Sequence, residues 1–160
     1  MKNNIISFFI SAAQTIFGEI GLGETLILEN IEKRDSFEVI INIGISGDMK
    51  ANLMIKTNFQ SAFNIVNSML NSINISPKEK VFGNLHKATI GEIANQISAR
   101  AVMLLSKENI DCNITPPTII TGKTVKMEMF NVKNLFDTGI QGKFGDIFLL
   151  IGIKNLKKII

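Results

Sequence analysis

The residues best suited to chemistry are Glu92 and Asn95, which lie three positions apart in a stretch with helical periodicity. Residues three apart are neighbours on a helix surface, so a carboxylate and an amide would lie side by side. The amide offers both a donor and an acceptor, which is enough to hold a water molecule in line for attack. Phosphoryl transfer needs little beyond such positioning and charge stabilisation. The pair therefore suits helping another protein to hydrolyse its own phosphate, with the carboxylate gripping a cation such as a lysine on that partner.

Other catalytic groups are scarce in this chain of 160 residues, which has one histidine, His86, and one cysteine, Cys112. A lone cysteine cannot form an intrachain disulfide, and its scarcity fits a reducing compartment. A single histidine argues against a histidine-built metal centre and against a Ser–His–Asp triad. We expect His86 to lie with its hydrogen bonds satisfied at a helix flank, and we assign no metal to this chain.

A helical wheel started at Val81 separates the pair from the apolar side chains around it. One arc of about 100° collects the expected core face of the helix, which consists of Ile90, Ile93, Ala94, Ile97, Ala101 and Leu104. Glu92 and Asn95 fall on the far side, towards water, with small or apolar neighbours. Those neighbours are Leu85, Ala88 and Ala99. Two polar side chains surrounded by small or apolar side chains form a ridge on the helix, and such a ridge indicates a surface that a partner approaches closely.

The spacing alone is weak evidence. Nine Glu and 17 Asn predict about one Glu-x-x-Asn match by chance in a chain of this length. A second match, Glu128 with Asn131, is indeed present. We expect it in a strand, where residues three apart face opposite sides and cannot form one site.

Periodicity and capping signals predict the other elements. The first 17 residues have apolar side chains at helical spacing. Alternating runs over 25–33, 36–45 and 49–57 predict strands, the last two forming a hairpin. A capping box with Thr57 as N-cap predicts a helix that ends near Asn71. A second capping box at Ser76, with Pro77 in the first turn, predicts the start of the long helix, which ends near Ser106.

The remainder of the chain alternates in short runs separated by turns. We expect strands over 110–115, 118–121, 124–130, 134–141 and 146–153. The order of helices and hairpins predicts one α+β domain over residues 1–160, with long helices packed on an antiparallel β-sheet.

Composition narrows the class of protein further. A chain that is 46% hydrophobic, with a net charge of +3, is too apolar to be disordered. Its lysines are scattered, without the aromatic interleaving of a nucleic-acid surface, and Lys154, Lys157 and Lys158 fit a solvated tail. Ser7 and Ser11 interrupt the N-terminal apolar run, and no run approaches a membrane span. We expect a cytoplasmic protein that binds neither nucleic acid nor membrane.

Several segments carry a family resemblance. Gly91-Glu92-Ile93-Ala94-Asn95-Gln96-Ile97 resembles the signature helix of the chemotaxis phosphatase family that includes CheX, CheC and FliY. Three further segments resemble the CheX branch and occur in the same order along the chain. They are Gly44–Lys50, Thr115–Lys123 and Phe144–Leu149.

The resemblance implies a CheC-like fold and a phosphatase acting on the aspartyl phosphate of a CheY-like response regulator. Asn95 would orient the attacking water, Glu92 would contact the receiver's lysine, and the ridge around them would dock the partner. The resemblance places the required Mg²⁺ in the partner, so no cofactor is assigned to this chain. It also implies a homodimer joined through the sheets. CheC-type members often have two such motifs, whereas residues 12–19 contain none.

Two positions depart from the family pattern. Ala88 stands where an Asp or Ser is usual, and Ala99 where a Gly often follows. The alternative is therefore a CheX-like binding module that docks a signalling or flagellar partner without catalysis. A third reading, an unrelated ligand-binding α+β domain, would need a large apolar pocket.

Overall fold

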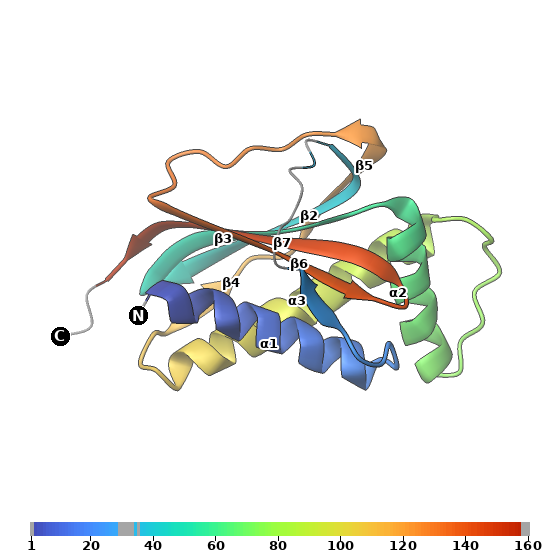
Figure 1. Ribbon diagram of the computed structural model, residues 1–160, viewed down its shortest axis with the longest axis horizontal. Coiled ribbons are helices and arrows are strands. Elements are labelled where there is room, and N and C mark those ends of the chain that lie inside the picture. The colour runs from blue at the N-terminus through green and yellow to red at the C-terminus, as the bar shows by residue number, and fades with distance from the viewer. Residues whose placement is uncertain (1, 29–33, 35, 158–160) are drawn as a thin grey trace.

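The computed structural model describes residues 2–28, 34 and 36–157. Within these residues the chain forms three helices and a seven-stranded sheet (Figure 1). In chain order the elements are α1 (Lys2–Glu19), β1 (Leu26–Leu28), β2 (Phe37–Gly47), β3 (Met49–Thr57), α2 (Phe59–Ser72), α3 (Asn84–Ser106), β4 (Cys112–Ile114), β5 (Thr118–Val125), β6 (Asn134–Gly142) and β7 (Gly145–Leu156).

Every strand pairing in the sheet is antiparallel, in the spatial order β1-β6-β7-β3-β2-β4. The predicted hairpin is confirmed as β2 and β3, and the last two predicted strands are confirmed as β6 and β7. β4 and β5 pair with successive parts of the same edge of β2. The predicted strand over 25–33 is confirmed only at β1, and residues 29–33 lie outside the described residues.

Helices cover one face of the sheet. Figure 1 shows α1 and α3 side by side beneath the strands, with α2 at one end. The alternation of β2 turns Ile41, Ile43 and Ile45 into the core that these helices close. Buried apolar side chains from all three helices join this core. The predicted fold class, long helices packed on an antiparallel sheet, is confirmed.

The opposite face of the sheet, the outer face, is crossed by residues 126–133 rather than by a helix (Figure 1). A Cβ added at Gly152 of β7 would meet Met129 and, at 3.0 Å, Val132. The predicted strand over 124–130 is therefore wrong from residue 126 onward, since Thr124 and Val125 are the last residues of β5. Met127 and Met129 are half-buried and Glu128 is exposed, which mimics strand alternation. The segment lies across the strands, however, and pairs with none of them.

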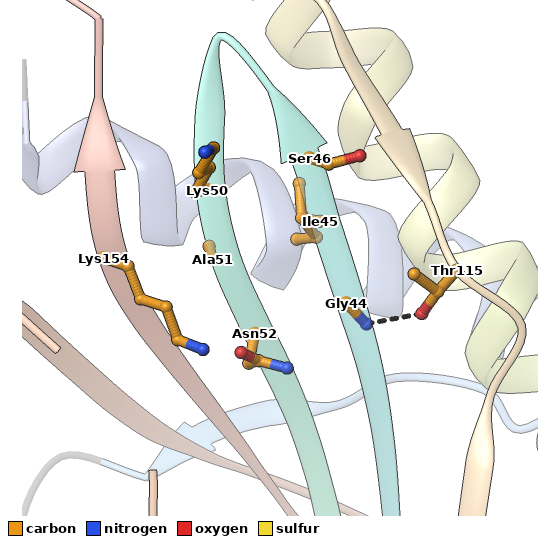
Figure 2. Close-up of a pocket in the computed structure, with 8 residues that line it drawn as sticks. All are labelled: Gly44, Ile45, Ser46, Lys50, Ala51, Asn52, Thr115 and Lys154. Carbon is orange, nitrogen blue, oxygen red and sulfur yellow. Dashed lines mark hydrogen bonds between the residues drawn. The ribbon is translucent and has the colours of Figure 1, made fainter. Parts of the chain in front are cut away.

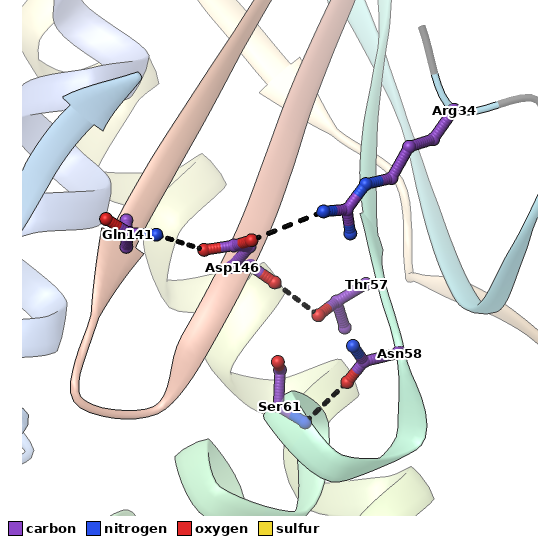
Figure 3. A network of polar contacts seen from close by, with 6 residues as sticks. All are labelled: Arg34, Thr57, Asn58, Ser61, Gln141 and Asp146. Atoms are coloured by element: carbon purple, nitrogen blue, oxygen red, sulfur yellow. Dashed lines mark hydrogen bonds and ion pairs between the residues drawn. The ribbon is translucent and has the colours of Figure 1, made fainter. Parts of the chain in front are cut away.

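The predicted start of α2 is one residue too early. Thr57 is the last residue of β3, and its hydroxyl donates to the carbonyl of Asp146 at 2.7 Å. Asn58 is the N-cap, because its side-chain oxygen accepts the backbone N–H of Ser61 at 2.7 Å (Figure 3). In the same figure Asp146 also accepts from Gln141 at 3.0 Å. The Thr57 bond ties the end of β3, directly before α2, to the start of β7, and the side-chain amide of Asn64 on α2 donates to the carbonyl of Phe144 in the β6–β7 turn at 3.1 Å.

The predicted start of α3 is wrong by about two turns. The helix begins at Asn84 after the N-cap Gly83, and the Ser76–Pro77 signal lies in the connection from α2. His86 supplies the cap instead, since its Nδ1 accepts the backbone N–H of Gly83 at 3.3 Å. Phe82 packs tilted against Phe59 of α2, with ring centroids 5.4 Å apart. Tertiary packing thus overrides the local capping signal. The predicted end at Ser106 is confirmed.

Candidate functional site

The site helix α3 is placed by a close approach at Gly91. This residue is buried, and a Cβ added to it would meet Cδ1 of Ile119 at 2.7 Å and Cγ of Pro117 at 3.5 Å. The helix therefore lies against the start of β5 at the residue that precedes Glu92. At the other end, Arg100 pairs with Glu19 of α1 at 3.0 Å. The buried contact at Gly91 fixes the position of the Glu92–Asn95 turn, and the exposed ion pair adds little because solvent screens it.

Glu92 is exposed and Asn95 is half-buried, one turn apart on the same helix. One carboxylate oxygen of Glu92, Oε1, accepts the side-chain amide of Gln96 at 3.3 Å. Within residues 2–28, 34 and 36–157, no group hydrogen-bonds to the side-chain amide of Asn95. Asn95 therefore presents a free donor and a free acceptor beside a carboxylate, at the edge of the packed interior.

The predicted docking ridge surrounds this pair. Leu85 is 37% exposed, Ala88 is exposed and Ala99 is half-buried. All three lie at spacings of four or seven residues from Glu92 or Asn95, so they share one side of α3. On this ridge the two alanines project only a methyl group each, and Leu85 adds an apolar side chain. A partner surface can therefore come close to the two polar side chains.

The opposite side of α3 packs into the core largely as the wheel predicts. Ile90, Ile93, Ala94, Ile97 and Ala101 are buried. The last predicted residue is wrong, because Leu104 is half-buried and Leu105 is buried instead. The backbone N–H of Ile110 bonds to the carbonyl of Leu105 at 3.1 Å, which folds the chain back over that residue.

His86 is wholly buried, at 0% exposure, and both ring nitrogens are engaged. In addition to the Gly83 bond, Nε2 lies 3.0 Å from the side-chain oxygen of Asn67 on α2. The ring stacks on Phe63 at 4.8 Å. Burial lowers the pKa of His86 despite the opposing charge of Glu79. The prediction of a satisfied histidine is confirmed, and its role is to hold the start of α3 against α2.

Neither a thiol nucleophile nor a metal centre emerges from the described residues. Burial raises the pKa of the Cys112 thiol, which keeps it protonated at neutral pH. No group of three or more His, Cys, Asp or Glu side chains among the described residues could hold a metal ion. In the same part of the chain, no helix is both long and apolar enough to cross a membrane.

A depression of about 250 Å³ lies on the outer face of the sheet (Figure 2). Lys50 and Lys154 line it, and Lys154 belongs to β7 rather than to the expected tail, while Lys158 lies outside the described residues. The hydroxyl oxygen of Thr115 accepts the N–H of Gly44 at 2.8 Å, which locks the β4–β5 connection onto β2. Both ammonium groups are exposed and therefore screened by solvent and salt. The depression offers no reacting group.

Sequence reasoning missed two residues at the site. Gly91 is needed for the approach of α3 to β5, and only the three-dimensional contact with Ile119 reveals this. Gln96 follows Glu92 by four residues, and that helical spacing could have predicted their hydrogen bond.

Comparisons with known proteins agree with this geometry. The profile of the family "Chemotaxis phosphatase CheX" matches residues 39–135. A relative named CheY-P phosphatase CheX, from Thermotoga maritima, is 26% identical over 137 residues, which cover 82% of this chain and 84% of the relative.

Solved structures give the same fold. CheX from Vibrio vulnificus superposes with a TM-score of 0.81 at 17% identity, covering 94% of this chain and 99% of that one. A chain of the CheX–CheY–BeF₃–Mg²⁺ complex from Borrelia burgdorferi superposes with a TM-score of 0.74 at 18% identity, covering 94% and 97%. With the family profile spanning more than half of its residues, this chain belongs to the chemotaxis phosphatase CheX family.

Proposed function

We propose that this protein is a phosphatase that removes the phosphoryl group from the aspartyl phosphate of a CheY-like response regulator. The observation that carries the proposal is the unbonded amide of Asn95 beside the exposed carboxylate of Glu92, on a ridge that a partner can approach. The names of the Thermotoga relative and the Borrelia complex support the choice of partner.

In the proposed reaction, the amide of Asn95 orients a water molecule in line with the phosphorus atom. Water attacks phosphorus, the bond from phosphorus to the aspartyl oxygen breaks, and inorganic phosphate leaves. The partner's aspartate is regenerated as a carboxylate, and the proton of the attacking water passes to phosphate. An amide is no practical base, so the contribution of Asn95 is position, for which phosphoryl transfer offers large gains.

Glu92 has a different part in the proposal. Its carboxylate would pair with the lysine of the receiver and so fix the receiver on the ridge. Mg²⁺ would be held by acidic residues of the receiver and would neutralise charge on the phosphoryl oxygens. This division leaves the chain described here with two tasks, which are docking and water orientation.

The test is phosphate release from a panel of phosphorylated receivers of the same genome, in the presence of Mg²⁺. At least one receiver should lose phosphate faster with the wild-type protein. Asn95→Ala should lower kcat by about 100-fold, the usual cost of losing one preorganised polar group. Glu92→Ala should act mainly by raising KM. If both variants match the wild type on every accepted receiver, the assignment of the site is wrong.

The second candidate is a docking module without catalysis, and the alanine at position 88 motivates it, since a polar residue is usual there in the family. The same panel separates the two. A receiver that binds with no change in the lifetime of its phosphate would favour the module. Restoring Ala88→Asp or Ala88→Ser would then show whether the missing polar group limits activity.

We further propose that the protein is a homodimer joined through its sheets. Two large apolar side chains on the outer face support this, since Phe130 is 72% exposed and Leu135 is 59% exposed. In a dimer joined through this face, both side chains would be removed from water. Sedimentation should give twice the chain mass for the wild type and the chain mass for the double variant Phe130→Asp/Leu135→Asp. A monomeric wild type would overturn the proposal.

A further inference from the structure

We infer that Gln96 is a positioning residue, which holds the carboxylate of Glu92 in the orientation that receives the partner's cation. The inference rests on the proposed function and deepens it. Gln96 lies four residues after Glu92, so its side chain is one turn further along the same side of α3. Its Nε2 donates to Oε1 of Glu92 at 3.3 Å, and Gln96 itself is half-buried.

The reason for a positioning role is the freedom of Glu92. A glutamate side chain on a helix surface samples many rotamers, and fixing it on binding costs entropy. Glu92 is exposed and, among the described residues, Gln96 is its hydrogen-bond partner. A half-buried glutamine is itself less free, so a bond to it narrows the rotamers of the carboxylate before any partner arrives. Preorganisation of this kind improves affinity without adding a contact to the partner.

The chemistry of the glutamine matters as much as its place. A carboxylate has two oxygens with about four acceptor sites, and one amide donor occupies one of them. Oε2 and the rest of Oε1 stay available for an ammonium group. The amide also carries no charge, so it neither neutralises Glu92 nor repels the cation that Glu92 is proposed to bind. A cationic residue at this position would neutralise Glu92 and would also repel the partner's cation.

Substitutions at position 96 form a graded series. Gln96→Met keeps the length and the apolar stem but removes the donor, so Glu92 should be less ordered. Gln96→Lys supplies a cation one turn after a glutamate, the favoured arrangement for a helical ion pair. That pair would compete with the partner's lysine and place a like charge beside it.

The measurements are KM and kcat for a receiver that the wild type accepts, and the Kd for the same receiver loaded with BeF₃⁻ and Mg²⁺. Gln96→Met should raise KM and Kd about threefold, consistent with partial loss of side-chain ordering. Gln96→Lys should raise them about tenfold at low salt, and the rise should shrink at high salt because the charges are exposed. The value of kcat should stay within twofold in both variants, since Asn95 is unchanged.

Gln60 offers a matched control on α2. It is an exposed helical glutamine whose side-chain amide donates to the side-chain oxygen of Asn64 at 3.0 Å. Gln60→Met and Gln60→Lys should leave KM, kcat and Kd unchanged. Thermal unfolding of all four variants should stay near that of the wild type, which excludes a loss of fold.

The inference and the proposed function can fail separately. A wild-type protein that is inactive on every receiver, and binds none, contradicts the proposed function itself. A wild type that is active and depends on Glu92, but whose KM and Kd are unchanged by both substitutions of Gln96, overturns the inference alone. An equal loss of kcat in the two variants would also overturn it, because it would place Gln96 in water orientation rather than in docking.

Discussion

Glu92 and Asn95 lie one turn apart on α3, whereas Glu128 and Asn131 lie in the irregular segment that crosses the outer face of the sheet. The two pairs have the same residue types at the same spacing. The first stands on a helix that Gly91 brings against Ile119 of β5. The second stands on a segment that forms no helix or strand, and its Asn131 has a left-handed φ of 57°.

The regularity of the supporting segment, and not the motif, therefore distinguishes the candidate site from the second match. A catalytic amide must be held within a fraction of an ångström of its working position. Glu92 and Asn95 lie on a helix whose opposite side is packed into the core. In the 126–133 segment, the half-buried side chains Met129 and Val132 lie over Gly152 of β7, while Glu128 and Asn131 are both exposed.

Among changes to the segments that carry the two pairs, the largest expected effect comes from breaking the support of the first pair. Gly91→Val should force α3 away from β5, because even a Cβ at Gly91 would lie 2.7 Å from Cδ1 of Ile119. Overpacking of this kind costs about 2 kcal/mol, which lowers the Tm of a chain of this size by about 4–8 °C. Displacement of the site should lower kcat/KM about tenfold. Calorimetry and phosphate release from an accepted receiver check the two values.

The control uses Ile119, the residue that lies against Gly91. Ile119→Ala removes the atoms that the new side chain would meet, so the double variant Gly91→Val/Ile119→Ala should recover activity relative to Gly91→Val. A Gly91→Val protein with wild-type stability and activity would show that the close approach does not position the site.

Local sequence patterns predicted much of the fold. The β2–β3 hairpin and the core side of α3 follow from side-chain periodicity, which acts within a few residues. Periodicity did not predict the start of α3, because that start depends on a bond between Gly83 and His86. Phe63 and Asn67 of α2 hold the ring of His86 in place for this bond. Such contacts join residues about 20 positions apart and leave no local signal.

For the candidate site, the sequence indicated the residues, which stay a prediction, but not the contacts that support them. Helical spacing and the family resemblance both indicated Glu92 and Asn95, and the structure places them on one side of α3. The wheel placed Asn95 on the side of the helix that faces water, and the residue is half-buried there. Residues 126–130 of the irregular segment were predicted as part of a strand because half-buried Met127 and Met129 alternate with exposed side chains, and periodicity cannot tell a paired strand from a crossing segment.

A smaller effect should follow from weakening the packing of residues 126–133 on the sheet. Met129 packs over Gly152 of β7, so Met129→Ala should lower the free energy of unfolding by about 1.5 kcal/mol, less than a fully buried methionine would cost. Because this segment lies on the face opposite α3, kcat and KM should stay within twofold of the wild type. Denaturant unfolding and the receiver assay check both. A large fall in kcat would mean that the outer face also supports the site.

The pH dependence of stability should report on the start of the site helix. Burial lowers the pKa of His86, and the neutral ring accepts the N–H of Gly83. This stabilisation is therefore complete above the unfolded pKa of about 6.5 and is lost as pH falls from there through the lower folded pKa. The slope cannot exceed about 1.4 kcal/mol per pH unit for one proton. Denaturant unfolding of the wild type and of His86→Gln should show this slope only in the wild type; parallel curves would contradict it.

The smallest expected effect is at the second pair. Glu128→Gln removes the carboxylate, and Asn131→Gly removes the amide at a residue whose φ of 57° glycine adopts without strain. Asn131→Ala would instead add backbone strain and confuse the comparison. Because both side chains are exposed and their support is irregular, the double variant should keep kcat and KM within twofold and the Tm within about 2 °C, as expected of surface substitutions. Phosphate release should be measured for this double variant and for Asn95→Ala with the same receiver. An equal loss of activity in both would show that the motif acts without a helix to hold it.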